Sequence, residues 1–174
     1  MDYKNYMDAD GVIQIPEGPT SIKREDFKGC ISKATKIILS NTVTRIEEKC
    51  FSDFPLLKEI IISDSVTEIG SCAFWNCQSL ASVTIPNSVT KIGEETFCNC
   101  SKITSITIPD GVTEIGDKAF CYCSSLTTVT IPGGVTKIWD YAFYSCESLA
   151  SITIPDNMVL GEDAIPPQTE IIYK

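Results

Sequence analysis

Residues 126–146 read Leu126-Thr-Thr-Val129-Thr-Ile131-Pro132-Gly-Gly-Val135-Thr136-Lys-Ile138-Trp-Asp-Tyr-Ala142-Phe143-Tyr-Ser-Cys146, and versions of this stretch recur along most of the 174-residue chain. The position before Pro132 marks one point in each copy, and the marked residues are Ile15, Leu39, Ile62, Ile85, Ile108, Ile131 and Ile154. Successive markers are 23 residues apart, except that the first step is 24. A repeat of this length indicates a stacked solenoid in which each copy forms one coil.

Apolar residues recur at fixed positions in the copies, and these positions identify the side chains that face the core. Two positions before the marker the residue is always Ile or Val, and seven positions after each of the first six markers it is Ile. Twelve positions after the marker is an unbroken phenylalanine column: Phe27, Phe51, Phe74, Phe97, Phe120 and Phe143. Fifteen positions after it is a column of mostly cysteine: Cys30, Phe54, Cys77, Cys100, Cys123 and Cys146. Stacked rings gain aromatic contacts in addition to burial.

The local pattern predicts the shape of one coil. Residues 149–154 alternate with a period of two and are rich in β-branched residues, which is typical of a strand. Pro132 and its equivalents end that strand, residues 135–138 form a second short extended run, and residues 140–145 are long enough for one helical turn. Glycines at positions 70, 93 and 116 precede that turn, and we expect them to need a positive φ. The sequence therefore predicts an α/β solenoid of about seven coils whose strands pair in parallel.

The composition excludes several classes of function. The formal net charge of −9 argues against a nucleic-acid partner and against docking on anionic lipid. Histidine is absent, which removes the commonest general base and the commonest neutral metal ligand. No apolar run approaches the ~20 residues that cross a bilayer, so we expect no membrane insertion. The first ten residues lack the apolar segment of a signal peptide.

The run Leu-x-x-Ile-x-Ile-Pro-x-x-Val-Thr-x-Ile-Gly-x-x-Ala-Phe-x-x-Cys closely resembles the BspA-like, or Treponema-type, leucine-rich repeat. The resemblance covers residues 12–155 and is clearest at residues 80–100, 103–123 and 126–146. It implies a curved solenoid with a parallel sheet on its concave side and short helical turns on its convex side. It also implies an extracellular or cell-surface protein of the kind linked to adhesion and to binding of host proteins. We expect residues 1–11 to form an N-terminal segment or cap and residues 156–174 a C-terminal cap.

The predicted binding site lies on the concave face, where the strand residues between the core positions point outward. The candidate ligand-binding residues are Lys36, Ile38, Glu59, Ile61, Ser82, Thr84, Ser105, Thr107, Thr128, Thr130, Ser151 and Thr153. Their hydroxyl groups suit a polar partner, and an exposed isoleucine pair suits an apolar one. Two alternatives remain open. Threonine is a good strand former that duplication copies without a ligand, and the N-terminal Tyr3, Tyr6 and Met7 would cover the isoleucines.

A second candidate contact is the aromatic group Trp139, Tyr141 and Tyr144, which breaks the repeat pattern in the last full coil. The alternative is that these side chains pack against residues 157–174 as part of the C-terminal cap. The sequence leaves both interpretations open.

The cysteine pairs Cys98-Asn-Cys100 and Cys121-Tyr-Cys123 do not predict a metal site. Zinc needs four converging ligands, whereas only Cys100 and Cys123 share the inward column. We expect mostly free thiols that act as small apolar residues with a weak donor. A calcium-loop-like fragment at residues 6–17 lacks an acidic first position and flanking helices. We therefore predict no metal and no cofactor.

No catalytic motif is present, so we expect no enzymatic activity. The chain contains no phosphate-binding loop, no nucleophile elbow and no histidine for a triad. Acidic pairs such as Glu94-Glu95 are expected to be exposed, solubilising charges. The leading hypothesis is a monomeric, non-enzymatic module that binds a protein or glycan partner through the concave face. The alternative is a structural spacer, or a repeat fragment of a larger surface protein, without a ligand of its own.

Overall fold

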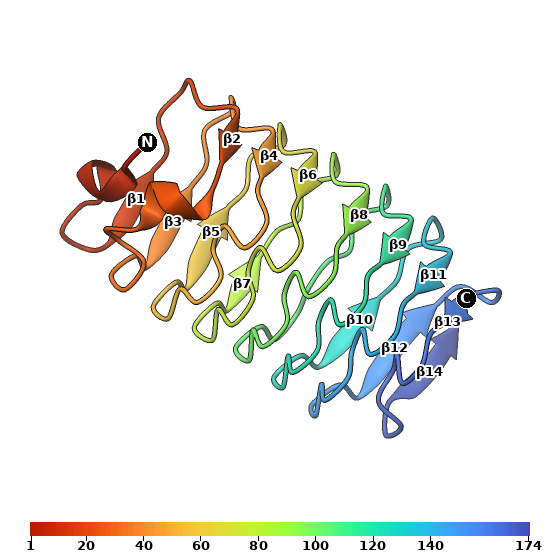
Figure 1. The fold of residues 1–174 in the computed structure, drawn as a ribbon. Coiled ribbons are helices and arrows are strands. Elements are labelled where there is room, and N and C mark those ends of the chain that lie inside the picture. Colours follow the sequence, from red (N-terminus) through yellow and green to blue (C-terminus); the bar gives the residue numbers. More distant parts are fainter.

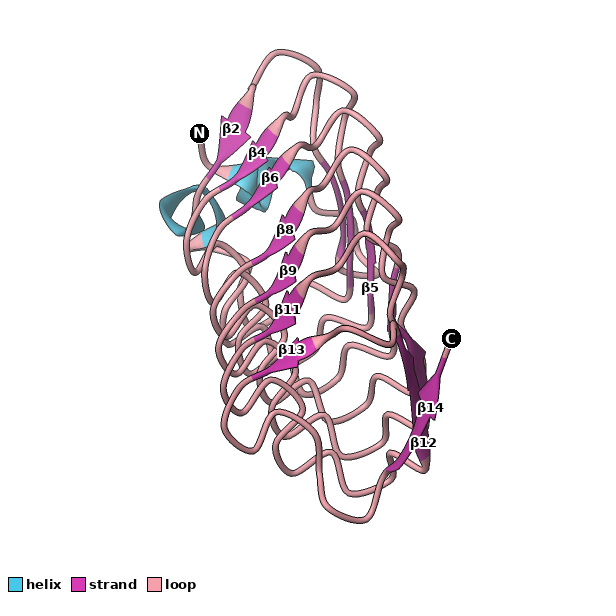
Figure 2. Ribbon diagram, turned by 90° about the vertical axis from the view of Figure 1, so that its right-hand side faces the viewer, coloured by secondary structure: helices cyan, strands magenta, loops and turns pink.

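The computed structural model describes all residues from 1 to 174 as a stack of short coils that runs from the N-terminus to the C-terminus (Figure 1). The first strands of the coils are β1 (Val12–Gln14), β3 (Lys36–Ile38), β5 (Glu59–Ile61), β7 (Ser82–Val83), β10 (Thr128–Thr130), β12 (Ser151–Ile154) and β14 (Glu170–Tyr173). The second strands are β2 (Ser21–Ile22), β4 (Arg45–Ile46), β6 (Glu68–Ile69), β8 (Lys91–Ile92), β9 (Glu114–Ile115), β11 (Lys137–Ile138) and β13 (Val159–Leu160). Figure 2 shows these two columns of strands on different sides of the coil.

All strand pairs are parallel, and the register follows the sequence repeat. Ile37 pairs with Ile60, and Val129 pairs with Ile152, so each core residue meets its own equivalent in the next coil. The first strands form two sheets, in the orders β1-β3-β5-β7 and β10-β12-β14. Between them the coil at residues 105–108 contributes one isolated bridge, from Ser105 to Thr128. The predicted parallel solenoid is therefore confirmed.

The phenylalanine column forms one continuous stack through the core. Consecutive rings from Phe51 to Phe143 have centroids 5.1 to 5.4 Å apart and are nearly parallel. At the N-terminal end, Phe27 meets Phe51 edge-on at 5.1 Å, and the ring of Tyr3 covers Phe27 at 4.9 Å. All these phenylalanines and Tyr3 are fully buried. Tyr3 therefore closes the stack with an aromatic ring from outside the repeats.

The inward cysteines link neighbouring coils through weak hydrogen bonds. The Cys77 thiol donates to the carbonyl of Phe51, and the Cys100 thiol donates to that of Phe74, at 3.0 and 3.1 Å. The Cys123 and Cys146 thiols make the same contact one and two coils further on, at 3.2 and 3.1 Å. Each thiol therefore fills a small apolar space and also donates to a core carbonyl.

The turn after the second strand differs from the prediction. A helical turn is present only in the first coil, as the 3-10 helix η2 (Arg24–Phe27); the other 3-10 helix, η1 (Tyr3–Tyr6), lies in the N-terminal segment. In later coils, residues with positive φ interrupt any helix at two columns: Lys49, Cys72, Glu95, Lys118 and Tyr141, and Asp53, Asn76, Asn99, Tyr122 and Ser145. This left-handed conformation is costly for residues other than glycine.

Hydrogen bonds to the next coil compensate for that cost. Alternate N–H groups of the turn point toward the following coil: those of Lys49, Phe51 and Asp53 donate to the carbonyls of residues 71, 73 and 75, at 2.8 to 3.0 Å. The pattern recurs along the stack. The turns thus form a third connecting surface in addition to the two columns of strands. A helix would direct these donors along its own axis and would leave the next coil unpaired.

The expectation that glycines before the turn need a positive φ is wrong. Among glycines, only Gly11 and Gly18 have positive φ. The requirement at Gly116 is close packing instead, because a Cβ there would lie 2.7 Å from the carbonyl carbon of Gly93. Glycine in this column lets the backbones of adjacent coils approach.

The ring stack yields a stability prediction. We expect Phe97→Ala to lower the free energy of unfolding by about 3–5 kcal/mol, because it opens a cavity between two stacked rings in the middle of the solenoid. Urea unfolding followed by circular dichroism measures the change. Thr107→Ala on the surface is the control and should change the free energy by no more than about 0.5 kcal/mol. Equal effects of the two substitutions would contradict the assigned role of the stack.

The cysteine column predicts a loss of stability in alkaline solution. Burial raises the pKa of Cys77 and of Cys146 from 9.0 to about 12. Because the folded state holds these protons more tightly than the unfolded chain does, their contribution to stability is complete below pH 9 and is lost as the pH rises toward about 12. Urea unfolding under reducing conditions should therefore show a lower free energy at about pH 10.5 than at about pH 8. In a Cys77→Ala, Cys146→Ala variant the difference should shrink, and an unchanged difference would contradict this account.

Candidate binding face

The first strands of the coils present their outward side chains on one surface, which we call the long-strand face. Parallel register places Lys36 beside Glu59 and Ile38 beside Ile61 in the N-terminal half. In the C-terminal half, all of the predicted hydroxyl residues lie on this face: Ser82, Thr84, Ser105, Thr107, Thr128, Thr130, Ser151 and Thr153. Each of the twelve predicted residues is exposed or half-buried. The structure thus brings these residues together in two neighbouring rows.

The hydroxyl groups of this face differ from those elsewhere in the solenoid. In the loops, Thr44, Thr67, Thr113 and Thr136 each donate a hydrogen bond to a threonine carbonyl of the preceding coil, at 3.1 to 3.4 Å. None of the eight hydroxyl residues on the long-strand face makes a side-chain hydrogen bond within the chain, whereas the loop residue Thr127 bonds to the Thr104 carbonyl. The loop hydroxyls therefore connect neighbouring coils, whereas the hydroxyls of the long-strand face remain available to solvent or to a partner.

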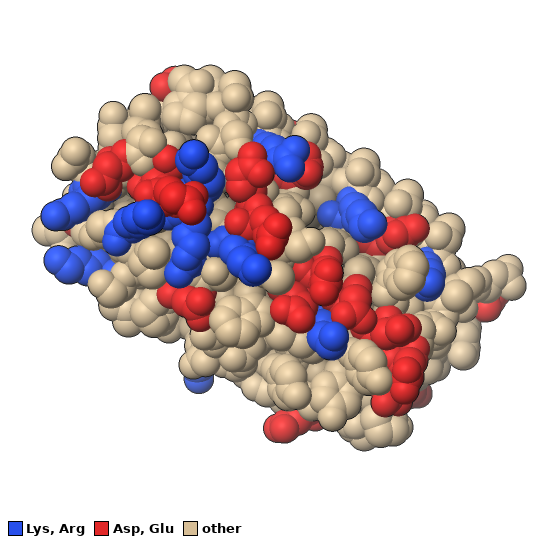
Figure 3. Space-filling view, in the orientation of Figure 1, with Lys and Arg blue, Asp and Glu red and all other residues tan.

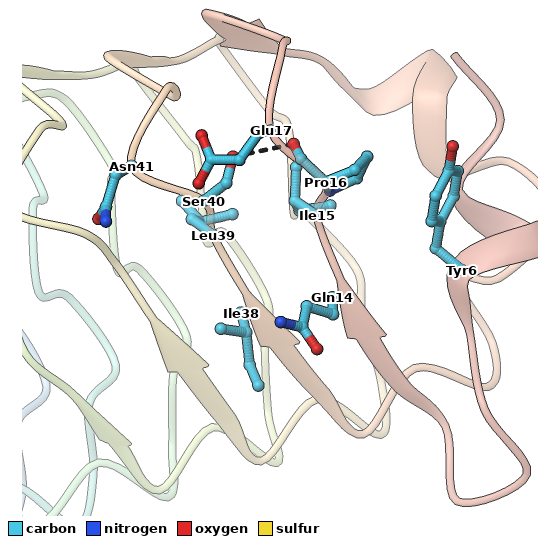
Figure 4. A pocket seen from close by; sticks show the side chains of 9 residues that line it. All are labelled: Tyr6, Gln14, Ile15, Pro16, Glu17, Ile38, Leu39, Ser40 and Asn41. Carbon is cyan, nitrogen blue, oxygen red and sulfur yellow. Dashed lines mark hydrogen bonds between the residues drawn. The ribbon is translucent and has the colours of Figure 1, made fainter.

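An open cavity lies at the N-terminal end of the face (Figure 4). It encloses about 520 Å³ between the ends of β1 and β3, and its lining residues are Tyr6, Gln14, Ile15, Pro16, Glu17, Ile38, Leu39, Ser40 and Asn41. Ile38 and Gln14 project toward the same space from adjacent strands, and Tyr6 stands across it. The cavity therefore combines an aliphatic floor with polar groups at its margin, which is typical of recognition sites.

The N-terminal segment does not cover the isoleucine pair. Tyr3 is buried against Phe27, Met7 forms an isolated bridge with Ile13, and Tyr6 stands 44% exposed at the cavity margin. Ile61 remains 43% exposed. We call Ile38 and Ile61 the isoleucine patch. Beside it, the Lys36 ammonium and the Glu59 carboxylate form an ion pair at 2.9 Å, so the charges flanking the patch neutralise each other.

Strand β14 extends the long-strand face by one coil. It pairs with β12 so that Glu170 lies beside Ser151 and Ile172 beside Thr153. The sequence predicted a C-terminal cap at residues 156–174 and did not place any of it on the binding face. The separation between Ile152 and its partner Ile171 is only 19 residues, so the 23-residue spacing no longer locates the strand. The β-branched and aromatic run Ile171-Ile172-Tyr173 was the available signal of a strand.

The predicted aromatic group is split into two sites by the structure. Tyr141 and Tyr144 meet edge-on at 5.8 Å, and Tyr122 meets Tyr144 in the same way, so these rings form a tyrosine cluster on the turns. Trp139 instead lies under the Lys137 ammonium, which is 3.0 Å from the ring centroid, and donates a hydrogen bond to Glu114.

Residues 157–174 contact the tyrosine cluster through Glu162 and through the residues beside Tyr144. The Tyr141 N–H donates to the Glu162 carbonyl. A side-chain hydrogen bond with Glu162 also raises the pKa of the Tyr141 hydroxyl. Tyr144 borders a surface hollow that includes Ile165 and Pro166. Tyr141 and Tyr144 thus contact the C-terminal segment, which is the alternative that the sequence offered for this aromatic group.

Charge is distributed unevenly along the solenoid. Residues 1–58 hold nine Lys and Arg and nine Asp and Glu, so the formal net charge of −9 falls entirely in residues 59–174. Figure 3 shows this asymmetry on one face, where basic side chains gather toward the N-terminal end and an acidic band runs toward the C-terminal end. The isoleucine patch and its cavity therefore lie in or next to the part of the molecule without net charge.

The structure contains no cluster of three or more His, Cys, Asp or Glu side chains arranged to hold a metal ion. All nine cysteines are free thiols. A hydrogen bond from Cys121 lowers the pKa of the Cys98 thiol, and both side chains are buried. No helix has the length and apolar character that crossing a bilayer requires.

Solved structures share this architecture. The leucine-rich repeat protein of T. pallidum is 28% identical with a TM-score of 0.82, and the match covers 87% of this chain and 73% of that one. A leucine-rich repeat protein from Eubacterium ventriosum ATCC 27560 is 22% identical with a TM-score of 0.64, covering 79% and 43% of the two chains. A leucine-rich repeat protein from Bacteroides ovatus ATCC 8483 is 24% identical with a TM-score of 0.50, and the match covers 93% of this chain and 63% of that one. The chain spans less than two thirds of the latter two proteins, and these two matches concern the fold alone.

The sequence also matches a described family. No curated protein sequence shows significant similarity to the chain. The family described as "BspA type Leucine rich repeat region (6 copies)" matches residues 11–123 and again residues 44–165, which together make up most of the chain. The match extends over the coils described above, from β1 into the segment that follows β13. This protein belongs to the BspA-type leucine-rich repeat family.

Proposed function

We propose that this protein is a non-enzymatic binding module that holds a protein or glycan partner on its long-strand face. The observation that carries the proposal is the contrast between two sets of threonines. The loop hydroxyls bond to neighbouring coils, whereas the hydroxyls of the face have no partner within the chain. The exposed hydroxyls of the face stand in two parallel rows and can donate to and accept from a partner.

The two halves of the face suit different parts of one partner. The hydroxyl rows offer donors and acceptors at the coil spacing of ~4.8 Å, which fits polar groups repeated along an extended chain. The isoleucine patch offers an aliphatic anchor beside a cavity of about 520 Å³, and anchors of this kind carry much of the energy of an interface. The neutral N-terminal third imposes little electrostatic repulsion on an acidic partner.

Membership of the BspA-type family supports a cell-surface or extracellular setting and a role in adhesion. Because proteins of one fold bind many different ligands, the class of partner has to be inferred from the binding site and not from the fold. The competing proposal is a structural spacer without a ligand. It predicts that no substitution on the long-strand face changes any interaction.

Binding to immobilised extracellular glycoproteins, before and after enzymatic deglycosylation, and to a glycan array tests the proposal. Two variants probe the two halves of the face: Ile61→Asp in the isoleucine patch and Thr107→Arg with Thr130→Arg in the hydroxyl rows. We expect each to weaken binding by roughly tenfold or more, because a charge placed in the interface loses its hydration. The matched control is Tyr122→Arg with Tyr144→Arg, which adds the same two charges on the turns.

The pattern of loss identifies the partner. Loss confined to Ile61→Asp, with binding kept after deglycosylation, indicates a protein partner. Loss in the Thr107→Arg, Thr130→Arg variant that parallels deglycosylation indicates a glycan. Weakening only in the tyrosine control would assign binding to the turns and would overturn the proposal. If the wild-type protein binds none of the probes, the structural spacer becomes the better account.

A further inference from the structure

Two cysteines lie side by side on the turns of neighbouring coils in the middle of the solenoid. Cys98 follows Phe97 and Cys121 follows Phe120, and the centroids of these two rings are 5.4 Å apart. The Asn99 N–H donates to the Cys121 carbonyl at 2.7 Å, which keeps the two turns in register. Backbones at such a spacing hold their Cα atoms within the range of ~4.4–6.8 Å that a disulfide spans. Cys98 and Cys121 therefore form a thiol pair that crosses from one coil to the next.

The two thiols of this pair are not equivalent. Hydrogen bonds from the Cys121 thiol and from the Trp75 indole lower the pKa of the Cys98 thiol, and the contact between the two thiols raises the pKa of Cys121. Because the thiolate is the reactive form of cysteine, Cys98 is the nucleophile of the pair. Cys98 is also 6% exposed, compared with 2% for Cys121, so an oxidant from solvent reaches Cys98 first. The pair thus has one sulfur suited to attack and a neighbouring sulfur suited to resolve the product.

The inward cysteines are stacked at the same coil spacing, but they are not suited to oxidation. The thiols of Cys100 and Cys123 each donate to a phenylalanine carbonyl of the preceding coil, at 3.1 and 3.2 Å. Both side chains are fully buried, and burial raises the pKa of each thiol well above its usual value. These cysteines therefore offer an oxidant neither a thiolate nor an exposed sulfur.

The two coils that carry the thiol pair are joined weakly on the side of the long-strand face. The N–H groups of Ala81 and Thr127 donate to carbonyls of their preceding coils, both at 3.1 Å, but the equivalent N–H of Thr104 has no main-chain acceptor. No main-chain hydrogen bond connects residues 81–85 with residues 104–108, and these are the only neighbouring coils without one on this face. In Figure 1 the interruption lies between β7 and β10.

The burial of the core residues shows the same loose contact. Val83 and Ile106, which face the core from these two coils, are each 7% exposed. Their equivalents Ile37 and Ile152, in fully paired coils, are 0% exposed. The phenylalanine stack and the hydrogen bonds of the turns therefore carry most of the connection between the two coils. The thiol pair lies on those turns.

The loose contact allows the closer approach that a disulfide needs. The Cβ atoms of a disulfide are ~3.8 Å apart, whereas paired strands keep equivalent residues ~4.8 Å apart. The turns must therefore approach each other by up to about 1 Å. Because no main-chain hydrogen bond fixes the spacing of these two coils on the long-strand face, they can tilt to close this gap.

We infer that Cys98 and Cys121 form a reversible disulfide in the presence of a peroxide and that this bond ties together the two coils least connected on the long-strand face. The Cys98 thiolate attacks one oxygen of hydrogen peroxide, the O–O bond breaks, and Cys98 becomes a sulfenic acid while hydroxide leaves. The Cys121 sulfur then attacks the Cys98 sulfur. The S–O bond breaks, and the Cys121 proton leaves with the hydroxyl group as water. Two sulfurs are oxidised and one peroxide is reduced. The inference does not depend on the proposed ligand.

Counting thiols before and after oxidation tests the assignment. The protein is treated with hydrogen peroxide at a concentration that oxidises glutathione in the same solution, then unfolded and alkylated for mass spectrometry. We expect the wild-type protein to lose two of its nine thiols and to regain both with dithiothreitol. Cys98→Ser and Cys121→Ser should each prevent this paired loss.

Two control variants locate the bond. The tryptic peptides 92–102 and 119–137 should be joined after oxidation, but each contains two cysteines. The Cys100→Ser, Cys123→Ser variant keeps donors for the phenylalanine carbonyls and should still give the joined peptides. Cys72→Ser, which removes the one half-buried thiol, should also leave the joined peptides unchanged.

Urea unfolding tests the connection between the coils. The disulfide closes a loop of 23 residues, so oxidation should raise the urea midpoint of the wild-type protein by on the order of 1 M. The same treatment should leave the midpoint of Cys98→Ser unchanged. Amide hydrogen exchange at residues 104–108 should slow in the oxidised wild-type protein, because the two coils then separate less often.

Four results would overturn the inference. A wild-type protein that keeps all nine thiols while glutathione is oxidised excludes the disulfide. Paired thiol loss that persists in Cys98→Ser or Cys121→Ser would place the oxidation elsewhere. Loss of the joined peptides in the Cys100→Ser, Cys123→Ser variant would assign the bond to the inward column. An oxidised wild-type protein with an unchanged urea midpoint would show that the bond does not tie the two coils together.

Discussion

Each coil rests on the next at the spacing of paired β-strands, and every other contact in the molecule has to fit that spacing. The ring centroids of the phenylalanine stack, 5.1 to 5.4 Å apart from Phe51 onward, fit it with a small offset. The thiols of the inward cysteines after Cys30 bridge the same spacing, because each reaches a phenylalanine carbonyl of the preceding coil at 3.0 to 3.2 Å. Because each side chain stacks on its equivalent, a residue that suits one coil suits them all, which explains why the columns are so uniform.

Much of the fold could be predicted from the sequence, because the repeat spacing translates directly into strand register. Ile37 pairs with Ile60 as a spacing of 23 residues requires. The turns were less predictable, since residues such as Lys49 and Tyr122 adopt positive φ that their residue types do not favour. Their conformation is imposed by hydrogen bonds to the following coil, which the sequence of a single coil does not reveal.

The candidate site was likewise only partly predictable from the sequence. Alternation along the strands was sufficient to place residues such as Thr107 and Thr130 on one outward face. It could not place Ile172 there, because the last coil departs from the repeat spacing. Nor could it separate Trp139 from the tyrosines, since neighbours in sequence lie on different surfaces where the chain turns. Residue type also did not distinguish a threonine whose hydroxyl bonds to the preceding coil from one whose hydroxyl is free. The difference is whether a backbone carbonyl lies within reach, which only the structure shows.

The turn hydrogen bonds give the stack a direction. In every coil with this turn, the N–H groups point toward the next coil, as Lys49 N–H does toward Ser71, and never toward the previous one. An added coil of this type would meet acceptors on one side and donors on the other wherever it was inserted. Gene duplication can therefore lengthen or shorten such a protein by whole coils without new contacts having to evolve. The two sides of a stack, by contrast, can never be interchanged, because one presents unpaired acceptors and the other unpaired donors. Each side therefore has to be covered in a different way.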